Sequence, residues 1–502
     1  MKAGPRDTAG GSQTGIDPRG QHPAAEPALL AVSLLLCGWM DIRALVLVLL
    51  VATSDFLIGA RLGVASNSRV RGRLLCASVS IDIGLLIAWR AAVAFPGPAG
   101  MLGGAPWSGA GELGALVPVG LSFFTLRSLG AVIDVYRGVT DPCATWVRYA
   151  AFLCFFPAFV AGPISRGIQL FPQLQGGIAL RWSGLAEGAA IFVQGLAKKM
   201  LIADRLATIA DPVFASPGLY PPWTVAAGIL AYSLQIYCDF AGYSDMAIGA
   251  ARAIGIDLPR NFNVPYLAPD IAEFWRRWHI TLSTWLRDYV FLPVAYVGSR
   301  WVDRMGLPRR RGELLNYAVA SVITMLLVGL WHGSGSGFLL WGGAHGVALA
   351  VHKVWQGAGR RKRRMPSWLG RALTFVFVGL SWVPFRAESV QGAGRVYAGL
   401  LGLGTQQTYE WFPSWLPICA AAVVLGHLVT LWSTGSGSAA MRAAVGHVMK
   451  ALGLTTAHKQ LAGMYLVPAG ITVLGACFTT LFILTILLFA PSQVGPFVYA
   501  SF

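Results

Sequence analysis

The sequence predicts an all-α protein that crosses a membrane many times. Of its 502 residues, 55% are hydrophobic and only 12% are charged, and the mean hydropathy is +0.59. A soluble globule of this length needs more polar surface than this composition supplies. The hydrophobic residues lie in long runs, and short clusters of arginine separate these runs. Composition, run length and loop charge therefore all predict a polytopic transmembrane helical protein.

Charge and cysteine usage exclude other classes. The formal net charge of +17 could indicate a nucleic-acid partner. However, the arginines lie in short clusters between apolar runs rather than along one face, and membrane topology explains them better, so we expect no nucleic acid as a partner. The seven cysteines show no CxxC spacing and mostly fall in apolar stretches. We therefore expect neither a metal site nor a disulfide framework.

The first 26 residues differ in composition from the rest of the chain. They are rich in Gly, Pro, Gln and isolated charges and offer no apolar face to bury, so we expect residues 1–26 to be a disordered leader. They lack the basic-then-apolar layout and the cleavage site of a signal peptide. Since no internal repeat or separate soluble domain is evident, we expect residues 27–502 to form a single membrane domain.

Hydropathy predicts roughly eleven membrane segments. The apolar runs cover residues 28–40, 44–60, 74–95, 116–135, 147–160, 184–202, 223–253, 314–331, 338–354, 373–383, 416–431 and 466–490. The first two are either two short helices or one kinked helix, since Asp41, Arg43 and Asp55 interrupt them. The run 223–253 is long enough to span with tilt or to contain a break.

One segment is too polar to face lipid along its length. Residues 271–290 are amphipathic and charged, so we expect them to lie at the interface or to re-enter the protein body. The basic stretches 309–311 and 360–364 bracket the next two apolar runs. By the positive-inside rule both are cytoplasmic, and the turn that carries His332 lies deep in the membrane or toward the opposite side.

Two histidines, His279 and His332, each follow a tryptophan within this apolar chain. An ionisable ring in a membrane bundle indicates a polar interior or cavity, because lipid exposure is costly. A neutral imidazole at His332 is suited to removing a proton from a hydroxyl. The alternative is a packing histidine bonded to a backbone carbonyl.

His279 follows a helical run in which Glu273 and Arg277 are spaced as an ion pair. The interleaved tryptophans and arginines of this run also suit a simple membrane-surface anchor. For His345 we prefer packing or pore lining. Asp239 and Asp245 lie in an apolar neighbourhood, where they serve as structural polar groups or as a proton relay.

Several longer motifs resemble those of the membrane-bound O-acyltransferase (MBOAT) family. The resemblance is to the branch that includes the alginate O-acetyltransferase membrane subunit and, more distantly, the D-alanyl transfer protein of teichoic acids. The motifs run in order from about residue 118 to residue 388 and comprise 118–124, 133–138, 156–157, 161–163, 243–249, 273–279, 283–289, 329–333, 341–346 and 385–388.

The resemblance implies an MBOAT fold and an O-acyltransferase with two site histidines in one tunnel through the membrane, with His332 as the catalytic residue and His279 as the second. Other candidates for lining this tunnel are Trp278, Trp331, Asp239, Tyr243, Asp245, Asn261, Arg276 and His345. The donor is expected to be a cytoplasmic thioester, acetyl-CoA or an acyl carrier protein, used as a co-substrate with no bound cofactor. The small residues 334–337 replace bulkier family residues, which predicts a wider or more mobile mouth beside His332.

The expected reaction moves an acyl group, expected to be acetyl, to a hydroxyl of an extracytoplasmic polysaccharide or other cell-surface acceptor. The expected location is the bacterial cytoplasmic membrane, in contact with lipid. An alternative is a polytopic transporter or channel with a His/Asp proton relay. A third possibility is a membrane protein that serves a separate extracytoplasmic acyltransferase.

Overall fold

A computed structural model describes residues 25–94, 118–178, 180–358, 365–403 and 415–433 of the chain, and within these ranges all regular structure is helical. The all-α prediction is confirmed for this part of the protein. The predicted leader lies outside the described residues, except that residues 25 and 26 begin the first helix. The apolar run 466–490 and the basic stretch 360–364 also lie outside them.

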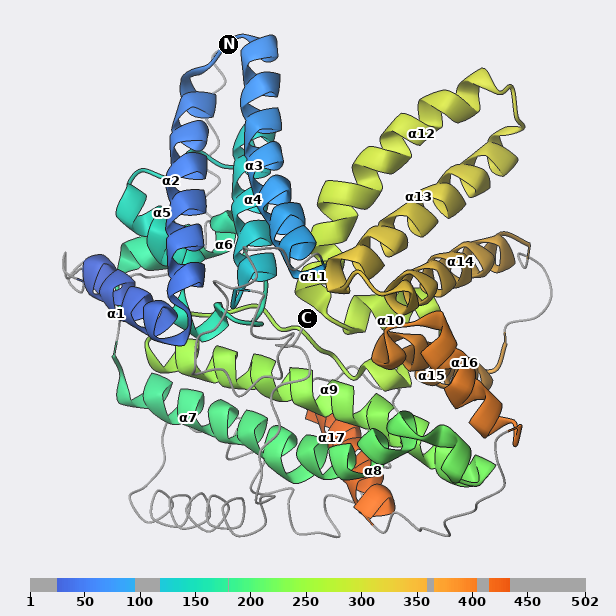
Figure 1. The fold of residues 1–502 in the computed structure, drawn as a ribbon. Coiled ribbons are helices and arrows are strands. Elements are labelled where there is room, and N and C mark those ends of the chain that lie inside the picture. The colour runs from blue at the N-terminus through green and yellow to red at the C-terminus, as the bar shows by residue number, and fades with distance from the viewer. Residues whose placement is uncertain (1–24, 95–117, 179, 359–364, 404–414, 434–502) are drawn as a thin grey trace, which may run out of the picture.

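The N-terminal helices form a bundle around one apolar core (Figure 1). Its helices are α1 (Ala25–Met40), α2 (Ile42–Val64), α3 (Ser68–Ala94), α4 (Leu121–Arg137), α5 (Trp146–Leu153) and α6 (Gly167–Gly176). Asp41 separates the first two, because its side chain accepts a hydrogen bond from the Arg43 backbone N–H at 2.9 Å and so caps α2. The first two apolar runs are therefore two helices, not one kinked helix.

Two long antiparallel helices cross beneath this bundle in Figure 1. They are α7 (Trp182–Ala197), which continues through a π-helical turn (Lys198–Ala203) into α8 (Asp204–Ala215), and α9 (Pro222–Ala253). The predicted run 223–253 is thus one unbroken helix of 32 residues. The helices touch through glycine: a Cβ added to Gly188 would lie 2.5 Å from the Gly249 carbonyl oxygen, and one added to Gly195 would lie 2.4 Å from that of Gly242.

The amphipathic segment 271–290 is broken rather than continuous. It forms α10 (Ile271–Arg277), α11 (Ile280–Leu286) and a π-helical turn (Arg287–Phe291) that leads into α12 (Leu292–Arg304). The remaining helices are α13 (Arg309–His332), α14 (Ser336–Ala358), α15 (Ser367–Ala387), α16 (Val390–Leu400) and α17 (Trp415–Ser433). The break between α10 and α11 falls at Trp278 and His279, in the middle of the molecule.

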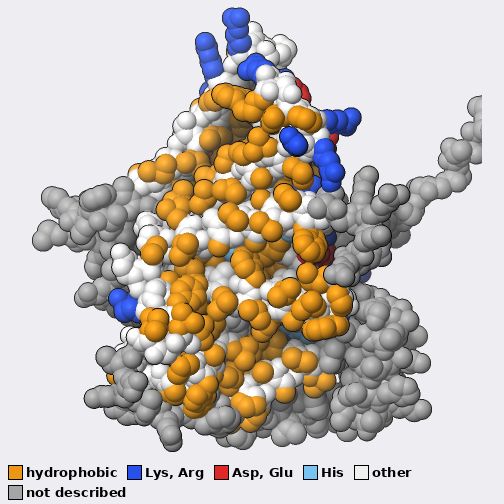
Figure 2. Space-filling view, turned by 90° about the vertical axis from the view of Figure 1, so that its right-hand side faces the viewer, with side chains coloured by type: hydrophobic (Ala, Val, Ile, Leu, Met, Phe, Trp, Pro, Cys, Tyr) orange, Lys and Arg blue, Asp and Glu red, His pale blue; other side chains and the backbone are white. Residues whose placement is uncertain are grey.

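Five of the described helices are long and apolar enough to cross a membrane. They are Ile42–Val64, the Ser68–Trp89 part of α3, Pro222–Ala253, Arg309–His332 and Ser367–Ala387. Figure 2 shows a broad face of hydrophobic side chains with lysine and arginine gathered at one end, as lipid contact requires. The described residues confirm a membrane-embedded helical protein, while the predicted total of roughly eleven segments remains a prediction.

Candidate active site

His332 is the last residue of α13, and only 3% of its surface is exposed. Three aromatic rings surround its imidazole, with centroids 4.7 Å away for Trp331, 5.0 Å for Phe385 and 5.3 Å for Trp341. These rings come from α13, α15 and α14, and we refer to them as the aromatic cluster. Three successive helices therefore enclose one titratable ring in apolar surroundings.

Glycine brings α13 and α14 close enough to form this cluster. A Cβ added to Gly342 would lie 2.2 Å from the Met325 carbonyl oxygen, and one added to Gly329 would lie 2.3 Å from that of Phe338. No side chain fits in these gaps, so the two backbones are in direct contact. The contact fixes the Trp341 ring against His332.

His279 lies at the break between α10 and α11 with a φ of 42°, a left-handed conformation that L-residues other than glycine, asparagine and aspartate seldom adopt. The ring is 1% exposed and packs edge-to-face on Phe240, with centroids 4.7 Å apart. Its centroid is 6.5 Å from that of Trp331. Trp331 is therefore a neighbour of both histidines, and their place in one catalytic site stays a prediction.

Burial lowers the pKa of His279 to about 3, because the cationic form would lose its hydration. The imidazole is therefore neutral at physiological pH.

Asn261 holds the break in place. Its backbone carbonyl accepts a hydrogen bond from Ile280 N–H at 2.9 Å, and its side-chain oxygen accepts one from Thr281 Oγ1 at 2.6 Å. Its Nδ2 donates to Ser244 Oγ on α9 at 3.2 Å. Asn261, predicted as a lining residue, thus positions the backbone of the segment that carries His279.

His345 is fully buried and uses both ring nitrogens. Trp275 Nε1 donates to Nδ1 at 3.3 Å, while Nε2 lies 2.9 Å from Ser381 Oγ, which itself donates to the Val378 carbonyl at 2.7 Å. This arrangement assigns the proton to Nε2. Since both nitrogens are engaged, His345 serves in packing, beside Trp341 at a centroid distance of 5.0 Å.

The two predicted aspartates are neutralised by lysine. Asp239 lies 2.8 Å from Lys199 Nζ, and the same Nζ lies 2.9 Å from Asp204. Asp245 pairs with Lys198. These lysines stand at the π-helical turn after α7, so the ion pairs join that turn to α9. They account for both aspartates as structural groups.

The other predicted residues lie farther from His332. Trp278 is buried against Trp382, with centroids 5.0 Å apart, and Trp382 in turn lies 5.3 Å from Phe385. Tyr243 packs between the N-terminal core and a neighbouring apolar cluster. Arg276 is 68% exposed and pairs with Glu273 within α10, so the structure does not bring it to the site.

The small residues after His332 do not widen the site. A Cβ added to Gly335 would lie 2.2 Å from the Glu388 carbonyl oxygen, and one added to Gly337 would lie 2.2 Å from that of Pro384. Gly337 N–H also donates to the Glu388 carbonyl at 2.9 Å. The expectation of a wider or mobile mouth is therefore wrong for this turn, because the end of α15 packs directly on its backbone.

The sequence interpretation missed Phe240 and Phe385 as neighbours of the two histidines. Both are ordinary apolar residues within hydrophobic runs, and nothing in their local pattern separates them from core residues. Trp341 falls within a motif but was not chosen as a site residue. Among the residues that the structure describes, no group of three or more His, Cys, Asp or Glu side chains is arranged to hold a metal ion.

Comparisons with known proteins identify this region. The model of the MBOAT, membrane-bound O-acyltransferase family, matches residues 145–383, which include both histidines and the aromatic cluster apart from Phe385. The probable alginate O-acetylase AlgI of Pseudomonas aeruginosa is 41% identical over 298 residues, which cover 59% of this chain and 54% of that protein.

Two further relatives have other named acceptors. The peptidoglycan O-acetyltransferase of Helicobacter pylori is 36% identical over 318 residues, covering 57% of each chain. The teichoic acid D-alanyltransferase of Streptococcus thermophilus is 29% identical over 245 residues, covering 47% of this chain and 57% of that protein. The chain thus spans just over half the length of the curated relatives that it matches. These matches make residues 145–383, which carry both buried histidines, similar to the membrane-bound O-acyltransferase family and to the alginate O-acetylases.

Proposed function

We propose that this protein is an O-acyltransferase that moves an acyl group, expected to be acetyl, from a cytoplasmic thioester to a hydroxyl of an extracytoplasmic acceptor. The observation that carries the proposal is the position of His332, buried in the aromatic cluster beside His279. The relatives named for alginate and peptidoglycan O-acetylation support a polysaccharide acceptor. The donor is acetyl-CoA or an acylated carrier protein.

In the proposed reaction, His332 accepts the proton of the acceptor hydroxyl while the oxygen attacks the thioester carbonyl carbon. A tetrahedral intermediate forms with negative charge on the former carbonyl oxygen. When it collapses, the carbon–sulfur bond breaks and the departing thiolate takes the proton from the imidazolium. The products are an ester and a free thiol, so His332 returns to its neutral state.

We propose the indole N–H of Trp341 as a donor to the oxyanion. Trp341 is fully buried and packs on His332, and its Nε1 has no hydrogen-bond partner among the residues that the structure describes. A buried donor is costly to leave unsatisfied unless a ligand uses it. Removing one such donor typically slows acyl transfer by about 100- to 1,000-fold.

The decisive experiment measures transfer from labelled acetyl-CoA, or from an acetylated carrier protein, to envelope glycans by the purified protein in nanodiscs. His332→Ala should slow transfer by about 100- to 10,000-fold, because it removes the base. His352→Ala is a matched control, since His352 lies on α14 with its side chain 19% exposed and pairs with Asp270 instead. Wild-type-like transfer by His332→Ala would refute the proposal.

The oxyanion assignment has its own test. Trp341→Phe keeps an aromatic ring but removes the N–H, so the maximal rate should fall while donor affinity changes little. Trp382→Phe makes the same change in the neighbouring ring, which stacks on Trp341 with centroids 5.8 Å apart, and should leave the rate near wild type. Equal rates for the two variants would exclude Trp341 as a specific donor.

The partner and location are proposals as well. We place the protein in the bacterial cytoplasmic membrane, where a separate extracytoplasmic acyltransferase is a possible recipient of the acyl group. Acyl-thioester hydrolysis without glycan acylation by the pure protein would indicate such a recipient. Solute flux across proteoliposomes with no acyl chemistry would instead support the transporter alternative, for which the lysine-paired aspartates offer no observation in favour.

A further inference from the structure

A second buried polar cluster lies in the N-terminal bundle, away from the histidines. Asp55 on α2 and Asp82 on α3 are both fully buried, and both helices are candidate membrane spans. Asp55 Oδ1 accepts a hydrogen bond from Ser78 Oγ at 2.7 Å, and Oδ2 accepts one from Ser128 Oγ at 2.6 Å. Ser128 Oγ also lies 2.9 Å from the hydroxyl of Tyr149.

The Asp82 side chain faces the same polar cluster, one helical turn beyond Ser78. It follows Ser78 by four residues on α3, so both side chains lie on one face of that helix. Its carboxyl is within hydrogen-bonding reach of the Asp55 carboxyl. No donor among the described residues hydrogen-bonds to either oxygen of Asp82.

No ion pair of the residues that the structure describes offsets the cost of burying the Asp55 and Asp82 carboxyl groups. Among the described residues, the buried aspartates at positions 204 and 239 have Lys199 as their counterion, whereas neither Asp55 nor Asp82 forms an ion pair. Two arginines of the same bundle have other partners: Arg127 of α4 donates to the carbonyl of Phe152 at 3.1 Å, and Arg71 of α3 donates to that of Tyr136 at 2.6 Å.

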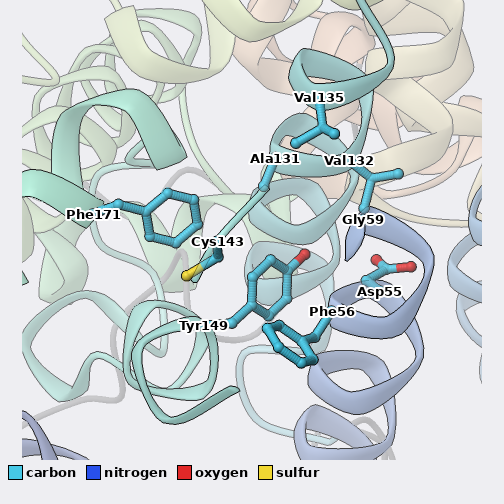
Figure 3. A pocket seen from close by; sticks show the side chains of 9 residues that line it. All are labelled: Asp55, Phe56, Gly59, Ala131, Val132, Val135, Cys143, Tyr149 and Phe171. Carbon is cyan, nitrogen blue, oxygen red and sulfur yellow. The ribbon is translucent and has the colours of Figure 1, made fainter. Parts of the chain in front are cut away.

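In the part of the chain that the structure describes, two other titratable groups face the pair, and neither carries a positive charge. They are Tyr149 of α5 and Cys143 of the segment before it. Both line a pocket with about 250 Å³ of empty space, including its mouth, to which Asp55 also contributes. Figure 3 shows Asp55 and Tyr149 in the wall of this pocket, together with residues of α2 and α4.

Two carboxylates cannot both remain charged in such surroundings. Like charges in close contact repel, and burial without a cation or a sufficient set of donors is very costly for each. A hydrogen bond between two carboxyl groups also requires a proton on one of them. We propose that Asp55 and Asp82 form a proton-binding site within the membrane, in which one proton is shared between the two carboxyl groups.

The shared proton joins the first helices of the bundle. Asp82 donates it to Asp55, while Ser78 and Ser128 satisfy the negative charge that remains. Since these groups come from α2, α3 and α4, and Tyr149 extends the chain of hydrogen bonds to α5, removal of the proton should loosen all four helices. The site does not involve the histidines, and it stands whether or not the proposed acyl transfer is correct.

Infrared spectroscopy of the full-length protein in nanodiscs tests the site directly. At neutral pH the wild type should show the carbonyl stretch of a protonated carboxylic acid, with a shift in D₂O. Asp82→Asn should lose this band, while Asp257→Asn, which alters a carboxyl that is 69% exposed, should keep it. A wild type without the band, or a band that survives both Asp82→Asn and Asp55→Asn, would overturn the proposal.

Thermal unfolding supplies a second readout. Raising the pH withdraws the proton and leaves two buried carboxylates in contact, so the unfolding temperature of the wild type should fall toward alkaline pH. The Asp82→Asn amide still donates to Asp55 and cannot lose its hydrogen so easily, so its unfolding temperature should stay level over the same range. A wild-type unfolding temperature that depends on Na⁺ in place of choline, without the acid band, would assign the cluster to a metal cation and exclude the proton.

Discussion

At the scale of single residues, the backbone at His279 decides the geometry of the site. A φ of 42° costs about 1–2 kcal/mol for a residue with a Cβ, and the surrounding structure must compensate for it. The compensation comes from Asn261, whose backbone and side chain accept hydrogen bonds from both residues after His279. Asn261, eighteen positions earlier in the sequence, therefore fixes the turn in which the His279 imidazole points to Phe240 and Trp331.

Asn261→Ala should destabilise the protein by about 1–3 kcal/mol, because it leaves the buried Thr281 hydroxyl without its acceptor. Acyl transfer should fall as well, since His279 would lose its fixed position. The measurement is chemical unfolding in mixed micelles, followed by a transfer assay on the folded fraction. Asn261→Asp keeps an acceptor for Thr281 and should lose less stability than the alanine variant, and the reverse order would contradict this account.

The burial of His279 and His332 was predictable from the sequence, because each follows a tryptophan in an apolar run, while their role in catalysis stays a prediction. The positive φ of His279 was not, since torsions at a helix break depend on Asn261 and other distant partners. Phe240 and Phe385 were also not predictable, because their role depends on which helices meet. The motif predicts Arg276 as a tunnel-lining residue, yet among the described residues its side chain pairs with Glu273 on its own helix.

At the scale of elements, the π-helical turn after α7 is tied to α9 by buried charges. Lys199 and Asp239 are 4% and 1% exposed, and Asp204 is 6% exposed. Hydropathy predicted both α7 and α9, but it could predict neither the π-helical turn nor the ion pairs that this turn forms. Lysine and aspartate lie 40 residues apart in the sequence, so their contact depends on the antiparallel packing of the two helices.

Lys199→Met should destabilise the protein by about 3–5 kcal/mol, because it leaves two buried carboxylates without their counterion. Adding Asp204→Asn and Asp239→Asn should restore part of this loss. Arg309→Met is a control, since the Arg309–Glu313 pair on α13 is exposed and should contribute little. Chemical unfolding would measure all three proteins, and wild-type stability in Lys199→Met would show that the charges are not structural.

At the scale of the whole molecule, the positions of the basic turns predict how the protein is oriented in the membrane. In Figure 1 the α2–α3 and α12–α13 turns lie at the same end of the protein. Arg309, Arg310 and Arg311 begin α13 and His332 ends it, so that the helix has 24 residues and is about 36 Å long. That length matches a membrane of about 30 Å, so hydropathy located this span accurately. It could not resolve the short and broken helices around the site, whose polar faces are buried in protein.

We expect the basic turns to face the cytoplasm. In a protein whose Cys76, Cys143 and Cys477 are replaced by serine, Arg69→Cys and Arg310→Cys should react with a membrane-impermeant thiol reagent in inside-out vesicles but not in intact spheroplasts. Labelling in the opposite preparation would reverse the proposed orientation. Labelling of the two cysteines from different sides would contradict the arrangement of the turns.

The glycine contacts between α7 and α9 constrain how the protein can change shape. Because carbonyl oxygens of one helix lie where Cβ atoms of the other would be, the two backbones pack directly on each other and leave no room for a side chain at these glycines. We therefore expect α7 and α9 to keep a fixed position relative to each other. Changes of shape near His332 should then come from the other helices, including the α12–α14 half that carries His332 itself.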